Sequence, residues 1–284
     1  MQSLVINSNE FPQRFDNGLV PETFKYRFLV EGDSWMDRSS AFQPSLLAKL
    51  APAMDATNDD CLFINLSRFG DTIRRIDECL NPDFRQWLRH TFNWKFDAIL
   101  LSAGGNDFID AARDPGPGQG ILRDLRGQPL PARGRDCIRR DAVADLITQW
   151  LDPSFSNIYN EIEASKHAGT PIFLNSYDTP TARNAPALKD GRTWLFEAYN
   201  TNGIPSTLWP DLTDSLFNDI QTTMVGWAQG RANVHIVLTD GTLTPAAPGS
   251  PGSDQDWLNE IHPNRTGWGK LAPVWHRTIK EVLP

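Results

Sequence analysis

Five short runs of apolar residues constrain the fold of this chain more than any other feature. They cover residues 26–31, 61–66, 98–102, 171–175 and 234–238. In these runs hydrophobic residues largely follow one another instead of alternating with polar ones, which is typical of a strand buried on both faces. The runs therefore predict a parallel β-sheet with other elements packed on both of its sides.

Helical patterns lie between these runs. Residues 136–151 carry most of their apolar side chains on one side, and Trp268, Leu271 and Trp275 repeat at helical spacing near the end of the chain. Strands that alternate with helices form βαβ units, which build parallel α/β sheets. Because 40% of the 284 residues are hydrophobic, the chain has enough apolar material for one large core. We predict a single α/β domain over residues 1–284 with a five-stranded sheet.

Three stretches interrupt this alternation and are predicted to be long loop insertions. They span residues 113–135, 178–210 and 241–255 and are rich in glycine and proline. Ligands of open parallel sheets bind beyond the carboxyl ends of the strands, so loops in such positions are candidate pocket walls. Four tryptophans in or near predicted loops are candidates for an apolar or sugar-stacking wall: Trp35, Trp194, Trp209 and Trp257.

The charge of the chain argues against nucleic acid as its main partner, because 27 Lys and Arg against 35 Asp and Glu give a net charge of −8. No apolar segment approaches the roughly 20 residues that span a bilayer, and the first residues lack the pattern of a secretory signal. We therefore predict no membrane span and a cytoplasmic protein, with export by another route left open. Cys61, Cys79 and Cys137 fit no metal-binding spacing and are predicted to be reduced thiols in or near the core.

A local group of arginines is the main exception to the acidic balance. It consists of Arg123, Arg126, Arg133, Arg135, Arg139 and Arg140. A solvated loop and helix start is the favoured interpretation, and recognition of an anionic substrate group is the alternative. The glycine-rich residues 116–120 lack the strand and the GK[ST] signature of a phosphate loop, and no HExxH motif is present. The sequence predicts no metal and no cofactor.

Ser34 lies in the tetrapeptide Gly32-Asp33-Ser34-Trp35, directly after the first apolar run. A serine at the exit of a buried strand can be held rigidly and remain open to a ligand. The free N–H groups and the dipole of a following helix would favour negative charge at this place. A serine that caps that helix is the alternative interpretation.

Two further segments follow the second and third runs. Gly70 can bring its backbone N–H close to a ligand because it has no Cβ. Asn106, in Gly104-Gly105-Asn106-Asp107, can offer its amide NH₂ to a crevice. Ordinary turn roles are the alternatives for both residues.

His262 is the histidine most suited to proton transfer. It precedes Pro263 in a loop ahead of the last helix, and at a pKa near neutrality it can take a proton from a serine hydroxyl and return it to a leaving group. His235 and His276 lie in a predicted strand and helix and are interpreted as structural. His90 and His167 have charged neighbours and are predicted to lie on the surface.

Taken in order, these four segments resemble the blocks of the SGNH (GDSL-type) hydrolase family, and the resemblance spans roughly residues 26–275. It implies a flavodoxin-like three-layer α/β/α fold and a metal-independent hydrolase of esters or thioesters. By this resemblance Ser34 is the nucleophile and His262 the general base. The backbone N–H groups of Ser34 and Gly70 and the amide of Asn106 would form the oxyanion hole.

The chain departs from the family pattern at one position. The family usually has an aspartate three residues before the histidine, whereas this chain has Asn259. Asn259 is the favoured orienting residue, Asp256 is held in reserve, and a backbone carbonyl is the third possibility. A neutral amide stabilises an imidazolium less than a carboxylate does.

The predicted function is hydrolysis of a small-molecule or carbohydrate ester through an acyl-enzyme, with a short acyl group such as acetyl as the first expectation. The alternative is a catalytically weakened protein of the same fold that binds a carbohydrate or a partner.

Overall fold

The computed structural model describes residues 2–37, 45–77, 82–113, 116–187 and 191–283. Within these residues six strands form one sheet in the order β1-β3-β2-β4-β5-β6, and every neighbouring pair is parallel. The strands are β1 (Leu4–Asn7), β2 (Tyr26–Gly32), β3 (Cys61–Asn65), β4 (Ala98–Ser102), β5 (Ile172–Asn175) and β6 (Val234–Val237). The five predicted runs correspond to β2 through β6.

The prediction of five strands was short by one, because β1 adds a sixth strand at the edge of the sheet. It pairs only with β3, and of its four residues only Ile6 is fully buried. An edge strand that is open on one side does not produce the long apolar run by which the buried strands are found.

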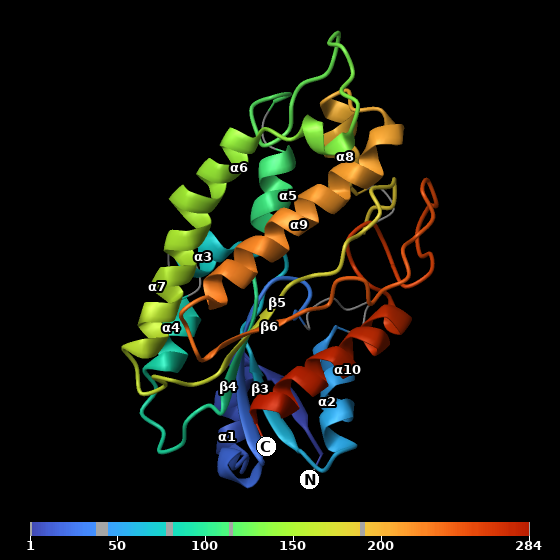
Figure 1. The fold of residues 1–284 in the computed structure, drawn as a ribbon. Coiled ribbons are helices and arrows are strands. Elements are labelled where there is room, and N and C mark those ends of the chain that lie inside the picture. Colours follow the sequence, from blue (N-terminus) through green and yellow to red (C-terminus); the bar gives the residue numbers. More distant parts are fainter. Residues whose placement is uncertain (1, 38–44, 78–81, 114–115, 188–190, 284) are drawn as a thin grey trace.

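Helices cover both faces of the sheet. Within the described residues they are α1 (Phe11–Asp16), α2 (Leu47–Asp55), α3 (Ile73–Asp77), α4 (Pro82–Leu88), α5 (Gly105–Arg113), α6 (Arg140–Leu146), α7 (Asp152–Glu163), α8 (Leu195–Thr201), α9 (Trp209–Ala228) and α10 (Arg265–Val282). Figure 1 shows α2 and α10 side by side on one face, with α7 and α9 on the other. The predicted segment 136–151 is helical from Arg140 and continues through a π-helical turn into α7.

The fold is the three-layer α/β/α arrangement that the sequence predicts. Without the added edge strand, the order β3-β2-β4-β5-β6 is the 2-1-3-4-5 order of flavodoxin-like folds. The chain leaves β2 and β4 in opposite directions, so a crevice forms beyond their carboxyl ends. Ser34 follows β2, Gly70 follows β3 and Asn106 follows β4, which brings three distant segments to one edge of the sheet.

The end of β2 is tied closely to the end of β4. Gly32 has φ +143°, and a Cβ there would lie 2.3 Å from the carbonyl oxygen of Ser102. The next residue, Asp33, donates its backbone N–H to the same carbonyl at 2.9 Å. Only glycine allows this approach, which fixes the start of the turn that carries Ser34.

Two predictions about histidine location were wrong. His167 is fully buried, with its ring centroid 5.1 Å from that of Phe96 and 5.6 Å from that of half-buried His90. The charged neighbours suggested a surface position, but the aromatic residues of the segment between α4 and β4 cover both rings.

Cys61 and Cys137 are buried free thiols, and Cys79 lies outside the described residues.

None of the helices in the described part of the chain combines the length and the apolar character that a membrane span requires. The second predicted loop insertion, 178–210, contains the short helix α8, and α9 begins at Trp209.

Candidate active site

Ser34, His262 and Asn259 form a continuous chain of hydrogen bonds. Ser34 Oγ lies 2.8 Å from His262 Nε2, and His262 Nδ1 lies 2.9 Å from Asn259 Oδ1. Ser34 is half-buried, whereas the other two side chains are buried. The residues come from the turn after β2 and from the loop before α10, more than two hundred positions apart in the sequence.

The environment of Asn259 fixes the tautomer of the imidazole. Asn259 Oδ1 also accepts the backbone N–H groups of Ile261 at 3.1 Å and His262 at 2.9 Å. Two backbone donors at one atom identify that atom as the oxygen, so His262 Nδ1 must donate to it as well. Nε2 then carries the lone pair and accepts the hydroxyl proton of Ser34. This arrangement can deprotonate the serine as it attacks a carbonyl carbon.

Asp256, the reserve candidate, lies in a different contact. Its Oδ2 accepts the backbone N–H of Thr244 at 2.6 Å and pairs with Lys270 Nζ at 2.5 Å. The carboxylate therefore ties the loop before α10 to that helix, and Asn259 occupies the position beside the imidazole.

His262 is enclosed by aromatic rings. Its ring stacks on Phe69 at a centroid distance of 5.8 Å and meets Trp194 edge-on at 5.4 Å. Burial, unrelieved by a nearby carboxylate, lowers the pKa of His262 to about 4. The imidazole is therefore neutral at pH 7 and can accept a proton. The imidazolium that results is destabilised by burial.

We expect Asn259→Asp to raise the pKa of His262 and to increase turnover at neutral pH by about tenfold. A carboxylate accepts the same three N–H groups and adds a negative charge beside the imidazolium. The pH dependence of kcat and an NMR titration of the His262 ring would measure both changes. Asn259→Ala is the control, because it removes the acceptor and should lower turnover. An aspartate variant that is no faster than the wild type would contradict this electrostatic interpretation.

Asn106 lines the small pocket together with Ser34, and Gly70 lies in the neighbouring loop after β3. Asn106, at the start of α5, gives one amide hydrogen to the carbonyl oxygen of Asp71 at 2.9 Å, and its NH₂ carries a second. The same contact ties α5 to the loop that contains Gly70. Gly70 has φ +76° and no atom within 4 Å of the place where a Cβ would stand. The backbone conformation, rather than a contact, therefore favours glycine there.

Two neighbouring pockets of very different size lie on the Ser34 side of the fold, and only the smaller is lined by Ser34. The smaller has a volume of about 20 Å³ and is lined by Ser34, Asn106, Ile109, Phe217 and Ile261 among others. The larger, about 790 Å³, lies between the segments that follow β5 and β6. Asp178 and Pro180 line both pockets, so the two are neighbours.

The larger pocket combines acidic side chains with a largely apolar wall. Its described lining includes Asp178, Asp214 and Asp240, together with Asn218, Gln221 and several threonines, but no Lys, Arg or His. Its walls come from the second and third predicted insertions, as predicted for pocket walls, and from α9. Trp209, at the start of α9, supplies an aromatic surface.

The four tryptophans predicted as candidates for a pocket wall lie in different environments. Trp209 lines the larger pocket, and Trp194 packs against His262. Trp35 is buried against Tyr177 and Trp268 but still lines the small pocket. The wall interpretation was wrong for Trp257, which is 1% exposed and belongs to the core beneath the loop before α10.

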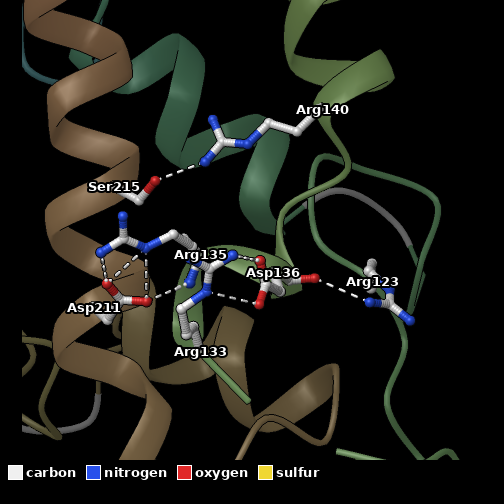
Figure 2. Close-up of polar contacts among 7 residues, drawn as sticks. All are labelled: Arg123, Arg133, Arg135, Asp136, Arg140, Asp211 and Ser215. Atoms are coloured by element: carbon white, nitrogen blue, oxygen red, sulfur yellow. Dashed lines mark hydrogen bonds and ion pairs between the residues drawn. The ribbon is translucent and has the colours of Figure 1, made fainter. Parts of the chain in front are cut away.

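The arginine group forms a surface network of ion pairs. Figure 2 shows Arg133 bound to Asp136 and Arg135 to Asp211, while Arg140 reaches Ser215 on α9. Arg140 also pairs with Asp219 at 2.6 Å, and Arg126 with Asp124 at 2.9 Å. These carboxylates pair with four of the six arginines, and among the described residues none of the six lines either of the two pockets. The geometry agrees with the solvated-surface interpretation.

Sequence analysis missed two buried charged residues that hold the His262 loop. Arg183, fully buried, donates to the carbonyl oxygens of Asn259 at 2.7 Å and Ser250 at 2.9 Å. Glu260, also fully buried, accepts backbone N–H groups of Arg183, Trp194 and Phe196. An arginine in a proline-rich loop reads as a surface residue, so no sequence signal identified it.

No cluster of three potential metal ligands occurs among the residues that the structure describes.

Comparison with known proteins identifies the fold. No protein-family model matches the sequence, and the search of curated proteins found no match. A solved lipase from a goat rumen metagenome superposes with a TM-score of 0.52 at 13% identity, covering 89% of this chain and 97% of that one. An extracellular lipase from Streptomyces rimosus gives a TM-score of 0.51 at 15% identity, covering 90% and 99%. Together with the sheet order, these likenesses show that the chain shares the three-layer α/β/α fold of these lipases, the fold that the resemblance to the SGNH (GDSL-type) hydrolases implies.

Proposed function

We propose that this protein hydrolyses carboxylic esters through an acyl-enzyme formed on Ser34. The observation that carries the proposal is the hydrogen-bonded series from Ser34 Oγ through the His262 ring to Asn259 Oδ1. It supplies a nucleophile, a base whose lone pair faces that nucleophile, and a neutral acceptor that fixes the tautomer of the base.

The reaction follows from this geometry. As Ser34 Oγ attacks the ester carbonyl carbon, its proton passes to His262 Nε2. The negative charge that develops on the carbonyl oxygen is stabilised by the Asn106 amide and by the backbone N–H groups of Ser34 and Gly70. Collapse of the tetrahedral intermediate transfers the proton from Nε2 to the leaving alcohol. A water molecule, deprotonated by the same nitrogen, then hydrolyses the acyl-enzyme and regenerates the serine.

The two pockets suggest which part of a substrate lies where. The pocket beside Ser34 and Asn106, about 20 Å³, suits a short acyl group such as acetyl. The larger acidic pocket suits a polar alcohol rich in hydroxyl groups, which aspartate, asparagine and threonine side chains can bind and on which Trp209 can stack. We therefore propose a short-chain ester of a polar alcohol, with a carbohydrate as the first candidate.

Fluorophosphonate labelling tests the proposal directly. We expect the probe to form one adduct on the peptide that contains Ser34, and p-nitrophenyl acetate to be hydrolysed faster than p-nitrophenyl octanoate. Mass mapping of the adduct and the kcat/KM values of the two esters would measure these outcomes. A protein that takes no label and cleaves no ester would contradict the proposal. Such a result would favour the alternative of a catalytically weakened binding protein, because Asn259 is neutral where the family pattern has a carboxylate.

A further inference from the structure

A buried carboxylate lies directly before the proposed nucleophile. Asp33 is 2% exposed, and three groups donate to it. Ser102 Oγ lies 2.9 Å and the backbone nitrogen of Trp35 3.0 Å from its Oδ1, while the Tyr177 hydroxyl lies 2.5 Å from its Oδ2. Because a buried carboxylate needs such donors, these contacts hold the side chain in one orientation.

Asp33 shapes the turn that presents Ser34. Its side chain binds the N–H of Trp35, two residues further on, which is the geometry of an Asx-turn. Its carbonyl oxygen accepts the backbone N–H groups of Met36 and Asp37 at 3.1 and 3.0 Å. Ser34 therefore lies inside a turn whose two sides are both fixed by the residue before it.

Tyr177, two residues after the end of β5, adopts a backbone conformation that is unusual for its type. Its φ is +59°, in a region that a bulky side chain rarely enters. Such strain persists only where the surroundings impose it, and it is concentrated at functional sites. Here Trp35 meets the Tyr177 ring edge-on at 5.1 Å, and a Cβ on Gly105 would lie 2.9 Å from that ring.

The Tyr177 side chain thus has two contacts with the proposed site. Its ring lines the small pocket together with Ser34 and Asn106, and its hydroxyl donates to Asp33. Burial raises the pKa of Tyr177 well above its usual value, so the hydroxyl stays protonated and acts as a donor.

We propose that Tyr177 is a positioning residue for the Ser34 nucleophile: its hydroxyl, together with that of Ser102, fixes the Asp33 carboxylate and thereby the turn that carries Ser34 Oγ to His262. The inference rests on the proposed esterase function and adds to it a residue from the segment that follows β5. It explains why a tyrosine is held at a positive φ at this point of the fold.

The arrangement makes the turn sensitive to acid. Burial raises the pKa of Asp33 to about 6, against the lowering effect of hydrogen bonds from Tyr177, Trp35 and Ser102. The titratable groups that face it are Tyr177, which follows β5, and Asp71, which follows β3 and whose charge raises the pKa further. As the pH falls through this pKa, one oxygen of the Asp33 carboxyl becomes protonated. That O–H is itself a hydrogen-bond donor, so one of the three groups that donate to Asp33 loses its acceptor. Activity carried by the ionised form is then lost on the acid side.

Tyr177→Phe isolates the hydroxyl, because the ring and its packing remain. We expect kcat for p-nitrophenyl acetate to fall about tenfold at neutral pH with little change in KM, as for loss of one hydrogen bond to a charged group. The variant also removes a contact that lowers the pKa of Asp33, so the acid limb of the pH–rate profile should move up by about one pH unit. Ser102→Ala should move it in the same direction.

Tyr199→Phe is the matched control. Tyr199 is also fully buried, and its hydroxyl bonds to Thr213 at 3.0 Å. Its loss should cost similar stability in urea unfolding and leave the acid limb in place. A Tyr177→Phe enzyme with the wild-type kcat and acid limb would overturn this inference while the esterase stands. A wild-type protein that takes no fluorophosphonate and cleaves no ester would instead overturn the proposed function, and the inference would fall with it.

Discussion

We expect Ser34→Ala to lower the turnover of p-nitrophenyl acetate by about 10⁴- to 10⁶-fold, and His262→Ala to lower it by a similar factor. Without the serine oxygen no acyl-enzyme can form, and without the imidazole that oxygen loses the base that contacts it. Ser34 Oγ and His262 Nε2 are 2.8 Å apart, so each is useful only in the presence of the other. The double variant should therefore be about as slow as either single variant.

Initial rates of the three variants, with burst kinetics to count acylated sites, measure this expectation. His276→Ala is the matched histidine control, since His276 lies on α10 and contacts Thr57 rather than the site. It should keep the wild-type turnover. A Ser34→Ala protein that remains active and still binds fluorophosphonate would mean that a different nucleophile carries the reaction.

The fold could be predicted largely because the buried strands have a local signature. Residues in β2, β4 and β5 are buried from both faces, so the apolar run is visible without knowledge of the neighbours. The strand β1 is defined by pairing with β3, a contact across more than fifty residues, and its four residues carry no comparable signature. Edge strands are therefore the part of such a sheet that sequence patterns miss.

The same distinction separates the two kinds of site residue. Ser34, Gly70 and Asn106 follow predicted strands of one parallel sheet, so strand order places their segments at the same edge, and His262 precedes a clear helix. Tyr177 contacts Asp33 across 144 positions, through the register of β2, β4 and β5. No spacing in the sequence encodes that contact. Residues that support the reacting groups from behind depend on tertiary packing and emerge only with the coordinates.

The orienting residue illustrates how far sequence reasoning reaches. The position of Asn259 relative to His262 follows from the family pattern, but the choice between Asn259 and Asp256 required geometry. Lys270 and the N–H of Thr244 occupy the Asp256 carboxylate, while two backbone N–H groups turn the Asn259 oxygen toward the imidazole. The two backbone N–H groups therefore make the Asn259 amide oxygen, and not its NH₂ group, the acceptor for His262 Nδ1.

Asn106→Ala is expected to reduce kcat by about 10²- to 10³-fold with a much smaller change in KM. The amide would donate to the oxygen only after it has become an oxyanion, so its loss raises the barrier more than it weakens substrate binding. The bond from Asn106 to Asp71 also holds the Gly70 loop, and urea unfolding would show whether that loss contributes.

Asn218→Ala provides the comparison for this variant. Asn218 is exposed on α9 and lines the larger pocket, away from the small one that contains Ser34 and Asn106. Its loss should leave the kcat for p-nitrophenyl acetate unchanged and weaken only the binding of esters with larger polar alcohols. Should Asn106→Ala instead raise KM and leave kcat intact, Asn106 would be a ground-state binding residue. The oxyanion would then have to be stabilised by the backbone N–H groups of Ser34 and Gly70 alone.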